Sequence, residues 1–200
     1  MNAALTFLLA NRIELIAFVL GVVNVTLVVR RSIWNYPFAI AMVALYAIVF
    51  YRTKLYSDAL LQIFFFVVNF YGWWMWLRAE QAEGEIRVLL MTGSARARWL
   101  VGIAVTALLW AAAMHRWTDA AYPYWDAPVA IPSVAAQILM SRRLLENWVL
   151  WIAVDILAIG LYATKGLWLT TVLYVIFLGL AIWGLAHWHH VRRAAGPSPA

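Results

Sequence analysis

The chain has 200 residues, of which 66% are hydrophobic and 12% charged, and this composition excludes an ordinary soluble domain. The net charge of +6 comes from basic residues scattered between apolar runs, which is typical of a membrane protein and argues against a nucleic-acid-binding patch. Cysteine is absent, so disulfides and thiolate metal sites are excluded.

Seven apolar stretches approach the roughly 20 residues that a helix needs to cross a bilayer. The fifth is short and contains Pro128 and Pro132, which predicts a bent helix and a hinge. The first residues do not resemble a cleaved secretory signal. We therefore predict an all-α integral membrane protein with spans at 13–29, 36–52, 58–77, 98–115, 125–140, 147–163 and 168–188.

Lys and Arg residues are distributed unevenly between the two sides that these spans define. The side with more basic residues is usually the cytoplasmic one. We therefore expect the N-terminus outside and the C-terminus in the cytoplasm, which requires an odd number of spans. The richer side holds Arg30, Arg31, Arg78, Arg87, Arg96, Arg98, Arg142, Arg143, Arg192 and Arg193, and the poorer side Arg12, Arg52, Lys54, Arg116 and Lys165.

A shift of 112 residues aligns the first three spans with the last three without a gap. Two three-helix units of the same orientation need one extra crossing between them. We therefore expect a 3+1+3 arrangement of two parallel repeats, with a solute site where the repeats face each other. The most informative aligned pairs are Asn35 with Asn147, Tyr71-Gly72 with Trp183-Gly184, and Trp76 with Trp188.

This arrangement divides the chain into six parts, of which the longest hydrophilic stretch is a linker without a pocket of its own. The predicted parts are an outer N-terminal segment (1–12), the first repeat (13–77), a cytoplasmic linker (78–97), a linker helix (98–115), the second repeat (125–188) and a cytoplasmic tail (189–200).

The candidate site is centred on the sixth predicted span, in the stretch E-N-W-V-L-W-I-A-V-D. Asn147, Trp151 and Asp155 are four residues apart, so a helix places them on one face. A charge near the bilayer centre costs roughly 2.5–3.5 kcal/mol on insertion scales, and a chain that carries one usually lines a polar cavity or an ion path. We interpret this face as one wall of a solute site. The alternative is that Asp155 pairs with a neighbouring helix and only holds the bundle together.

Other spans carry polar and aromatic residues at helical intervals. Amides inside spans are costly without partners, so they either bond between helices, for about 0.6 and at most roughly 2 kcal/mol, or converge on one solute. Their convergence with Asp155 favours the solute site. Asp58 is the exception, because it stands near the outer end of its helix and is expected to be solvated. The candidates are Asn35, Gln62, Asn69, Trp73, Gln137, Thr170 and Tyr174.

Many of the thirteen tryptophans lie near the ends of spans, where indoles anchor the membrane interface. Trp151 is placed to stack on a ligand, and Trp73 is a second candidate for that role. The expected interfacial anchors are Trp34, Trp76, Trp117, Trp125, Trp168 and Trp188.

Enzyme signatures are absent: the chain has no H-E-x-x-H, no G-x-x-x-x-G-K-[ST] and no G-x-S-x-G. His187, His189 and His190 follow each other near a basic tail and are expected to be interfacial histidines rather than metal ligands. We expect neither enzymatic activity nor a cofactor.

Several aromatic-rich motifs together resemble the PnuC family of bacterial vitamin transporters, over about residues 12 to 188. The motifs are I-W-N-Y-P-F-A-I (33–40), K-L-Y-S-D-A-L-L-Q (54–62), N-F-Y-G-W-W-M-W (69–76), E-N-W-V-L-W-I-A-V-D (146–155), K-G-L-W-L-T (165–170) and the Tyr174–Trp183 span, whose Trp183 joins the candidate site.

The resemblance implies a seven-helix 3+1+3 fold related to the sugar-transporting SWEET proteins. It also implies uptake of nicotinamide riboside by facilitated diffusion across the inner membrane, with cytosolic phosphorylation trapping the solute. The resemblance further implies a homo-oligomer, such as a trimer.

The polar-aromatic face suits such a solute, because indole faces attract a pyridinium cation and amides both donate and accept hydrogen bonds. Thiamine, also an aromatic cation, is an alternative solute. A membrane-embedded enzyme and a structural subunit are alternatives from other classes. For a transporter we expect one repeat to rock against the other, with bending at Pro128 and Pro132.

Overall fold

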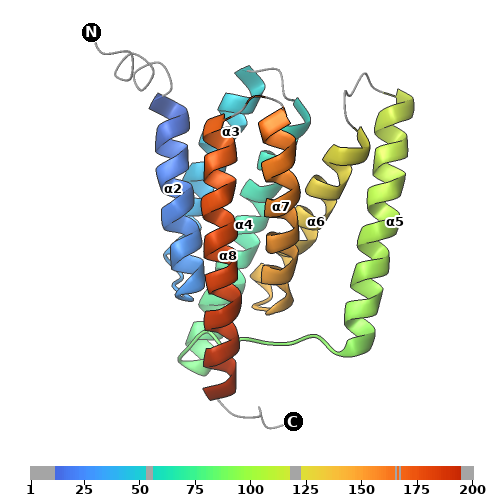
Figure 1. The fold of residues 1–200 in the computed structure, drawn as a ribbon. Coiled ribbons are helices and arrows are strands. Elements are labelled where there is room, and N and C mark those ends of the chain that lie inside the picture. Colours follow the sequence, from blue (N-terminus) through green and yellow to red (C-terminus); the bar gives the residue numbers. More distant parts are fainter. Residues whose placement is uncertain (1–11, 53–55, 118–122, 165, 167, 195–200) are drawn as a thin grey trace.

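The computed structural model describes residues 12–52, 56–117, 123–164, 166 and 168–194, which form seven helices and no strand. The predicted all-α fold class is confirmed, and each predicted span corresponds to one helix (Figure 1). The helices are α2 (Arg12–Val29), α3 (Asn35–Arg52), α4 (Tyr56–Glu83), α5 (Gly93–Trp117), α6 (Pro123–Ser141), α7 (Glu146–Thr164) and α8 (Trp168–Ala194).

Five of these helices are long and apolar enough to cross a membrane: α2, α4, α5, α7 and α8. The apolar part of α3 is shorter, from Asn35 to Val49, and α6 contains Pro128 and Pro132. Large apolar side chains are exposed on the outer surface, as Leu108 and Leu109 of α5 illustrate. Such a surface is suited to lipid rather than to water.

By their contacts, six of the helices form two three-helix units. In the first unit α3 packs against α2 and α4, and in the second unit α7 packs against α6 and α8. The two units meet where α4 packs against α6 and where α8 packs against α2, while α5 packs against α6. The third helix of each unit therefore packs against the first helix of the other unit.

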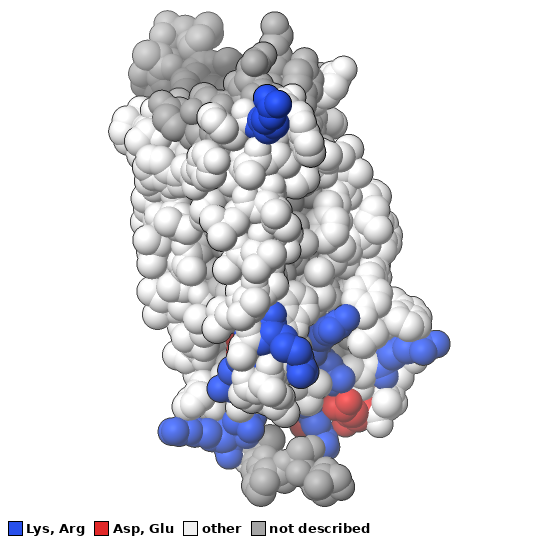
Figure 2. Space-filling model, turned by 90° about the vertical axis from the view of Figure 1, so that its right-hand side faces the viewer, with Lys and Arg blue, Asp and Glu red and all other residues white. Residues whose placement is uncertain are grey.

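Basic side chains gather at one end of the molecule, which we call the Arg-rich end (Figure 2). The helices α2, α4, α6 and α8 finish there, and α3, α5 and α7 begin there (Figure 1). On the face that Figure 2 shows, few charged side chains lie between this end and the other. A central band of this kind matches the hydrocarbon layer of a bilayer.

Three helices extend at least five residues beyond the predicted apolar spans, among them α8, which was predicted to end at 188 and continues to Ala194. The third span was predicted to end at residue 77, but α4 continues to Glu83, and α5 begins at Gly93 rather than at 98. A helix satisfies its own backbone hydrogen bonds, so it can leave the apolar layer without a break. The segment 84–92 between α4 and α5, which we call the strap, crosses the Arg-rich end.

Several local contacts recur at the spacing of 112 residues. Asn35 and Asn147 lie in the first turn of α3 and α7, and each side-chain amide donates to the carbonyl oxygen three residues earlier, at 2.7 and 2.6 Å. Arg31 and Arg143 both have a positive φ, of 56° and 63°, and each is the second residue after the end of a helix. Left-handed residues commonly end helices in this way. These equivalences belong to the two-repeat interpretation, which stays a prediction.

The two aligned glycines also have equivalent surroundings. A Cβ on Gly72 would lie 2.8 Å from a ring atom of Tyr36, and one on Gly184 would lie 2.6 Å from a ring atom of Trp148. Tyr36 and Trp148 are themselves 112 residues apart. In each unit the third helix therefore approaches an aromatic ring of the second helix too closely for any larger residue.

Candidate solute-binding site

A cavity of about 500 Å³ lies between the two units and is lined by residues of all seven helices. Its volume is in the range of small-molecule sites. Of the ten residues predicted to bind the solute, six line this cavity: Gln62, Asn69, Gln137, Trp151, Asp155 and Tyr174. The sequence candidates from four different helices therefore converge on one space.

Asp155 is the buried acid of this cavity. Helix α7 places it one turn from Trp151 on the cavity wall, where the residue is only 2% exposed. Within the described residues its carboxylate forms no ion pair. A buried carboxylate is unfavourable without a partner, so this position suits a solute that brings a positive charge or hydroxyl groups.

Aromatic rings form much of the rest of the wall. Trp151 of α7 faces Phe65 of α4, with ring centroids 6.4 Å apart and planes inclined at 54°. On α8, Tyr174 lies 5.7 Å from Phe177 and 5.2 Å from Tyr162, again between centroids. All five rings line the cavity. Flat π-faces of this kind stack on planar heterocycles and attract cations.

Two buried amides join the units beside these rings. The Gln137 side chain donates through Nε2 to Asn69 Oδ1 at 2.9 Å, which links α6 to α4. One such bond uses only part of the capacity of two amides, since each has two N–H groups and an oxygen with two lone pairs. The pair therefore joins the helices and still has donors and acceptors for a solute in the cavity.

Acidic side chains outnumber basic ones in the cavity lining. Among the described lining residues the acidic side chains are Asp126 and Asp155, and Lys, Arg and His do not occur. A cavity with carboxylates and no cation favours neutral or positively charged solutes over anions.

The other four predicted residues lie outside the lining. Asn35 and Asn147 are buried in the first turn of their helices and donate to carbonyl oxygens of the preceding loops. Trp73 packs against the buried cluster near the Arg-rich end. Trp183 is 41% exposed on the outer side of α8, with its ring 6.4 Å from His187. The four-residue spacing put Asn147 on the same face as Trp151 and Asp155, but in the first turn of α7 its Nδ2 donates to the carbonyl oxygen of Leu144, away from the lining.

Asn24 of α2 was not among the sequence candidates. It is buried, lines the cavity, and its Oδ1 has no hydrogen-bond partner. An amide with an unpartnered oxygen is a costly group to bury, and a solute donor would satisfy it. The signal was present in the sequence, as a lone amide in the middle of the first apolar span.

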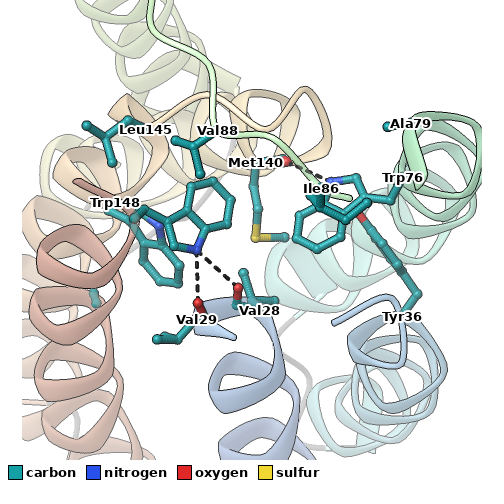
Figure 3. Close-up of a cluster of buried hydrophobic side chains, with 12 residues drawn as sticks. Val28, Val29, Tyr36, Trp76, Ala79, Ile86, Val88, Met140, Leu145 and Trp148 are labelled. Atoms are coloured by element: carbon teal, nitrogen blue, oxygen red, sulfur yellow. Dashed lines mark hydrogen bonds between the residues drawn. The ribbon is translucent and has the colours of Figure 1, made fainter. Parts of the chain in front are cut away.

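Two expected interfacial anchors are buried instead. Trp76 and Trp188 have no exposed surface and lie in an apolar cluster at the Arg-rich end (Figure 3). The prediction that they anchor the membrane interface is wrong, because their indole N–H groups donate to backbone carbonyls inside the protein. By contrast Trp34, Trp117 and Trp168 are strongly exposed.

The sequence as a whole matches a known family. A family model described as "Nicotinamide mononucleotide transporter" matches residues 11–190, which is nearly the full chain. The chain belongs to the nicotinamide mononucleotide transporter family. It is therefore a membrane transporter and not an enzyme, as the sequence predicted.

Individual members of the nicotinamide mononucleotide transporter family agree with this assignment. The nicotinamide riboside transporter PnuC of Escherichia coli (strain K12) is 28% identical, over 92% of this chain and 87% of its own. The riboflavin/roseoflavin transporter RibM of Streptomyces davaonensis is 26% identical, over 88% of this chain and 83% of its own. A crystal structure of the vitamin B3 transporter PnuC, 28% identical, has a TM-score of 0.82 and covers 96% of this chain and 86% of that chain.

Proposed function

We propose that this transporter carries nicotinamide riboside across the bacterial inner membrane. The observation that carries the proposal is the cavity between the two units, in which Asp155, Trp151 and the Asn69–Gln137 pair meet and no basic side chain is present among the described residues. The solute has a positively charged pyridinium ring, a carboxamide and a ribose, and each of these finds a chemically suitable group there.

The pyridinium ring is the part of the solute that the cavity lining is best suited to bind. Trp151 and Phe65 offer π-faces, and a cation over an aromatic face gains roughly 0.5–2 kcal/mol. Asp155 supplies the neutralising charge or accepts from a ribose hydroxyl. The amides of Asn69 and Gln137 match the carboxamide, which has both a donor and an acceptor.

The same lining disfavours the phosphorylated form of the solute. A phosphate would bring negative charge beside two carboxylates, with no cation among the described lining residues to compensate. We therefore propose the riboside rather than the mononucleotide as the transported form. Phosphorylation in the cytosol would then prevent its return, and this trapping would drive net uptake by facilitated diffusion.

The transport cycle that we propose is alternating access, with one unit rocking against the other about the cavity. Pro128 and Pro132 remove two backbone hydrogen bonds from α6, so this helix is the element most suited to bend.

The Arg-rich end would face the cytoplasm by the positive-inside rule, with the C-terminus on that side. A homo-oligomer, trimeric by the resemblance to the family, is part of the proposal.

Reconstituted protein tests the substrate directly. Liposomes that contain the purified transporter, a riboside kinase and ATP should accumulate labelled nicotinamide riboside well above empty liposomes, and omission of the kinase should leave only equilibration. External nicotinamide mononucleotide should compete poorly. Absence of accumulation with folded protein would contradict the assignment.

Riboflavin is the second candidate, because the family includes a relative named as a riboflavin/roseoflavin transporter. Thiamine, an aromatic cation, is the third. Competition against labelled riboside with each vitamin separates the three. Riboflavin is neutral, so its transport should not depend on the charge of Asp155, whereas transport of either cation should.

A further inference from the structure

A buried apolar cluster (Figure 3) lies on the side of the cavity that faces the Arg-rich end. Val28, Met140 and Trp148 belong both to the cavity lining and to this cluster, which therefore forms the cavity floor. The lining in the other direction reaches Asp126 and Thr170, close to the opposite ends of α6 and α8. A solute that moves through the protein has to pass the cluster.

Two indole N–H groups donate hydrogen bonds across this cluster, from one unit to the other (Figure 3). Trp76 of α4 donates through Nε1 to the carbonyl oxygen of Met140 at 3.2 Å. Trp188 of α8 donates to the carbonyl oxygens of Val28 and Val29, at 3.3 and 3.1 Å. The acceptors lie in the last turns of α6 and α2, where carbonyls have no partner within their own helix. The units cannot separate at this end while both bonds persist.

The orientation of each indole is set by its own unit. Tyr36 meets Trp76 edge to face, with centroids 5.5 Å apart and planes at 88°. Trp148 meets Trp188 in the same way, at 5.5 Å and 89°. The two indoles also approach each other, with centroids 6.1 Å apart. Each unit thus presents a preoriented donor to a backbone acceptor of the other.

The strap covers the same cluster and is bonded to both units. In the first unit, the Arg31 guanidinium donates to the carbonyl oxygen of Ile86 at 2.7 Å. In the second unit, the Leu89 N–H donates to the carbonyl oxygen of Arg143 and the Leu145 N–H donates to that of Leu89, both at 2.9 Å. The apolar side chain of Ile86 is buried in the cluster.

We propose that Trp76, Trp188 and the strap form the gate that opens the cavity toward the Arg-rich end, and that the structure has this gate closed. Opening separates the third helix of each unit from the first helix of the other, which breaks both indole bonds. Because the strap holds a loop of each unit, it has to release one of them during the same movement. The gate rests on the proposed transport function, but it can be tested without any solute.

The absence of cysteine in the sequence allows a single-cysteine reporter. Ala39→Cys places a thiol in the cavity lining, and Ala130→Cys provides a second position. A membrane-impermeant maleimide is added to right-side-out or inside-out vesicles, so that each end of the protein is probed separately. In a single-cysteine variant with no other substitution, the thiol should react with reagent added at the end opposite the Arg-rich end and react slowly with reagent added at the Arg-rich end.

Trp76→Phe and Trp188→Phe keep an aromatic ring but remove the N–H donor. Losing one such bond should shift the closed-to-open equilibrium by about two- to tenfold, so the double variant should react more than the single ones from the Arg-rich side. Ile86→Ala should shift labelling in the same direction by loosening the strap. Trp74→Phe and Trp168→Phe, which alter exposed indoles of the same two helices, should have no effect.

Unchanged labelling from the Arg-rich side, in variants with a normal melting temperature, would overturn the gate. If the double variant does not fold, labelling of the single variants and of Ile86→Ala tests the same prediction. A failure of the proposed function is distinguishable: labelling would then change as expected, while the liposomes would accumulate no riboside.

Discussion

Position within a helix decides what a polar or aromatic residue does in this protein. Asn147 and Asp155 lie on one helix, but the amide at the helix start bonds its own backbone while the acid lies deeper, on the cavity wall. The sequence placed Asp155 correctly beside Trp151, because a four-residue interval fixes a helical face. It misplaced Trp76 and Trp188, because a tryptophan near the end of a span has the same signature whether it faces lipid or a neighbouring helix.

Asp155→Asn should weaken the binding of nicotinamide riboside by roughly 10- to 100-fold, since a hydrogen bond to a charged group is worth about 1.5–3 kcal/mol. The substitution keeps the shape of the side chain, so insertion and folding should be unaffected. Equilibrium binding to purified protein measures the change.

The dihydro form of the riboside, which lacks the pyridinium charge, is the matched control ligand. Its affinity should fall little in the same variant. An equal loss for both ligands would show that Asp155 contacts the ribose hydroxyls rather than the ring.

At the scale of the helix, small residues set how closely the third helix of each unit approaches the second. Gly184 of α8 faces the Trp148 ring, and the equivalent Gly72 of α4 faces Tyr36. The 112-residue shift predicted that these two glycines are equivalent, but not what they contact. That information depends on which way each helix is turned, and an apolar helix in a membrane carries little amphipathic signal to show it.

Gly184→Ala should destabilise the protein by about 1–3 kcal/mol, because the added Cβ would lie 2.6 Å from the Trp148 ring and the indole would have to move. Thermal unfolding in detergent measures the effect. Gly179→Ala on the same helix is the control, since nothing lies within 4 Å of its Cβ position. Equal melting temperatures for the two variants would contradict the packing argument.

At the scale of the whole molecule, the fold class and all seven helices were predictable from sequence. Length and hydropathy decide these features, and the backbone must satisfy its own hydrogen bonds in a bilayer. Helix ends were less predictable, as α4 and α5 show, since hydropathy marks the apolar layer and not the last helical turn. The strap was predicted only as a linker, because its bonds to both units arise from tertiary contacts between distant segments.

The membrane orientation that we propose rests on the basic residues that gather at the Arg-rich end (Figure 2). A green fluorescent protein fused after the C-terminus should be fluorescent, and alkaline phosphatase at the same place should be inactive. The same two reporters fused after Trp117, at the opposite end of α5, should give the reverse result. Active phosphatase at the C-terminus would invert the assignment of the two ends.

The two indole bonds end on main-chain oxygens, and this has an evolutionary consequence. A mutation at Val28, Val29 or Met140 changes a side chain but leaves the accepting oxygen in place. Only the donors can be lost by substitution. Descendants of this sequence should therefore exchange the side chains at the acceptor positions for other apolar ones of similar size, while natural selection retains the tryptophans.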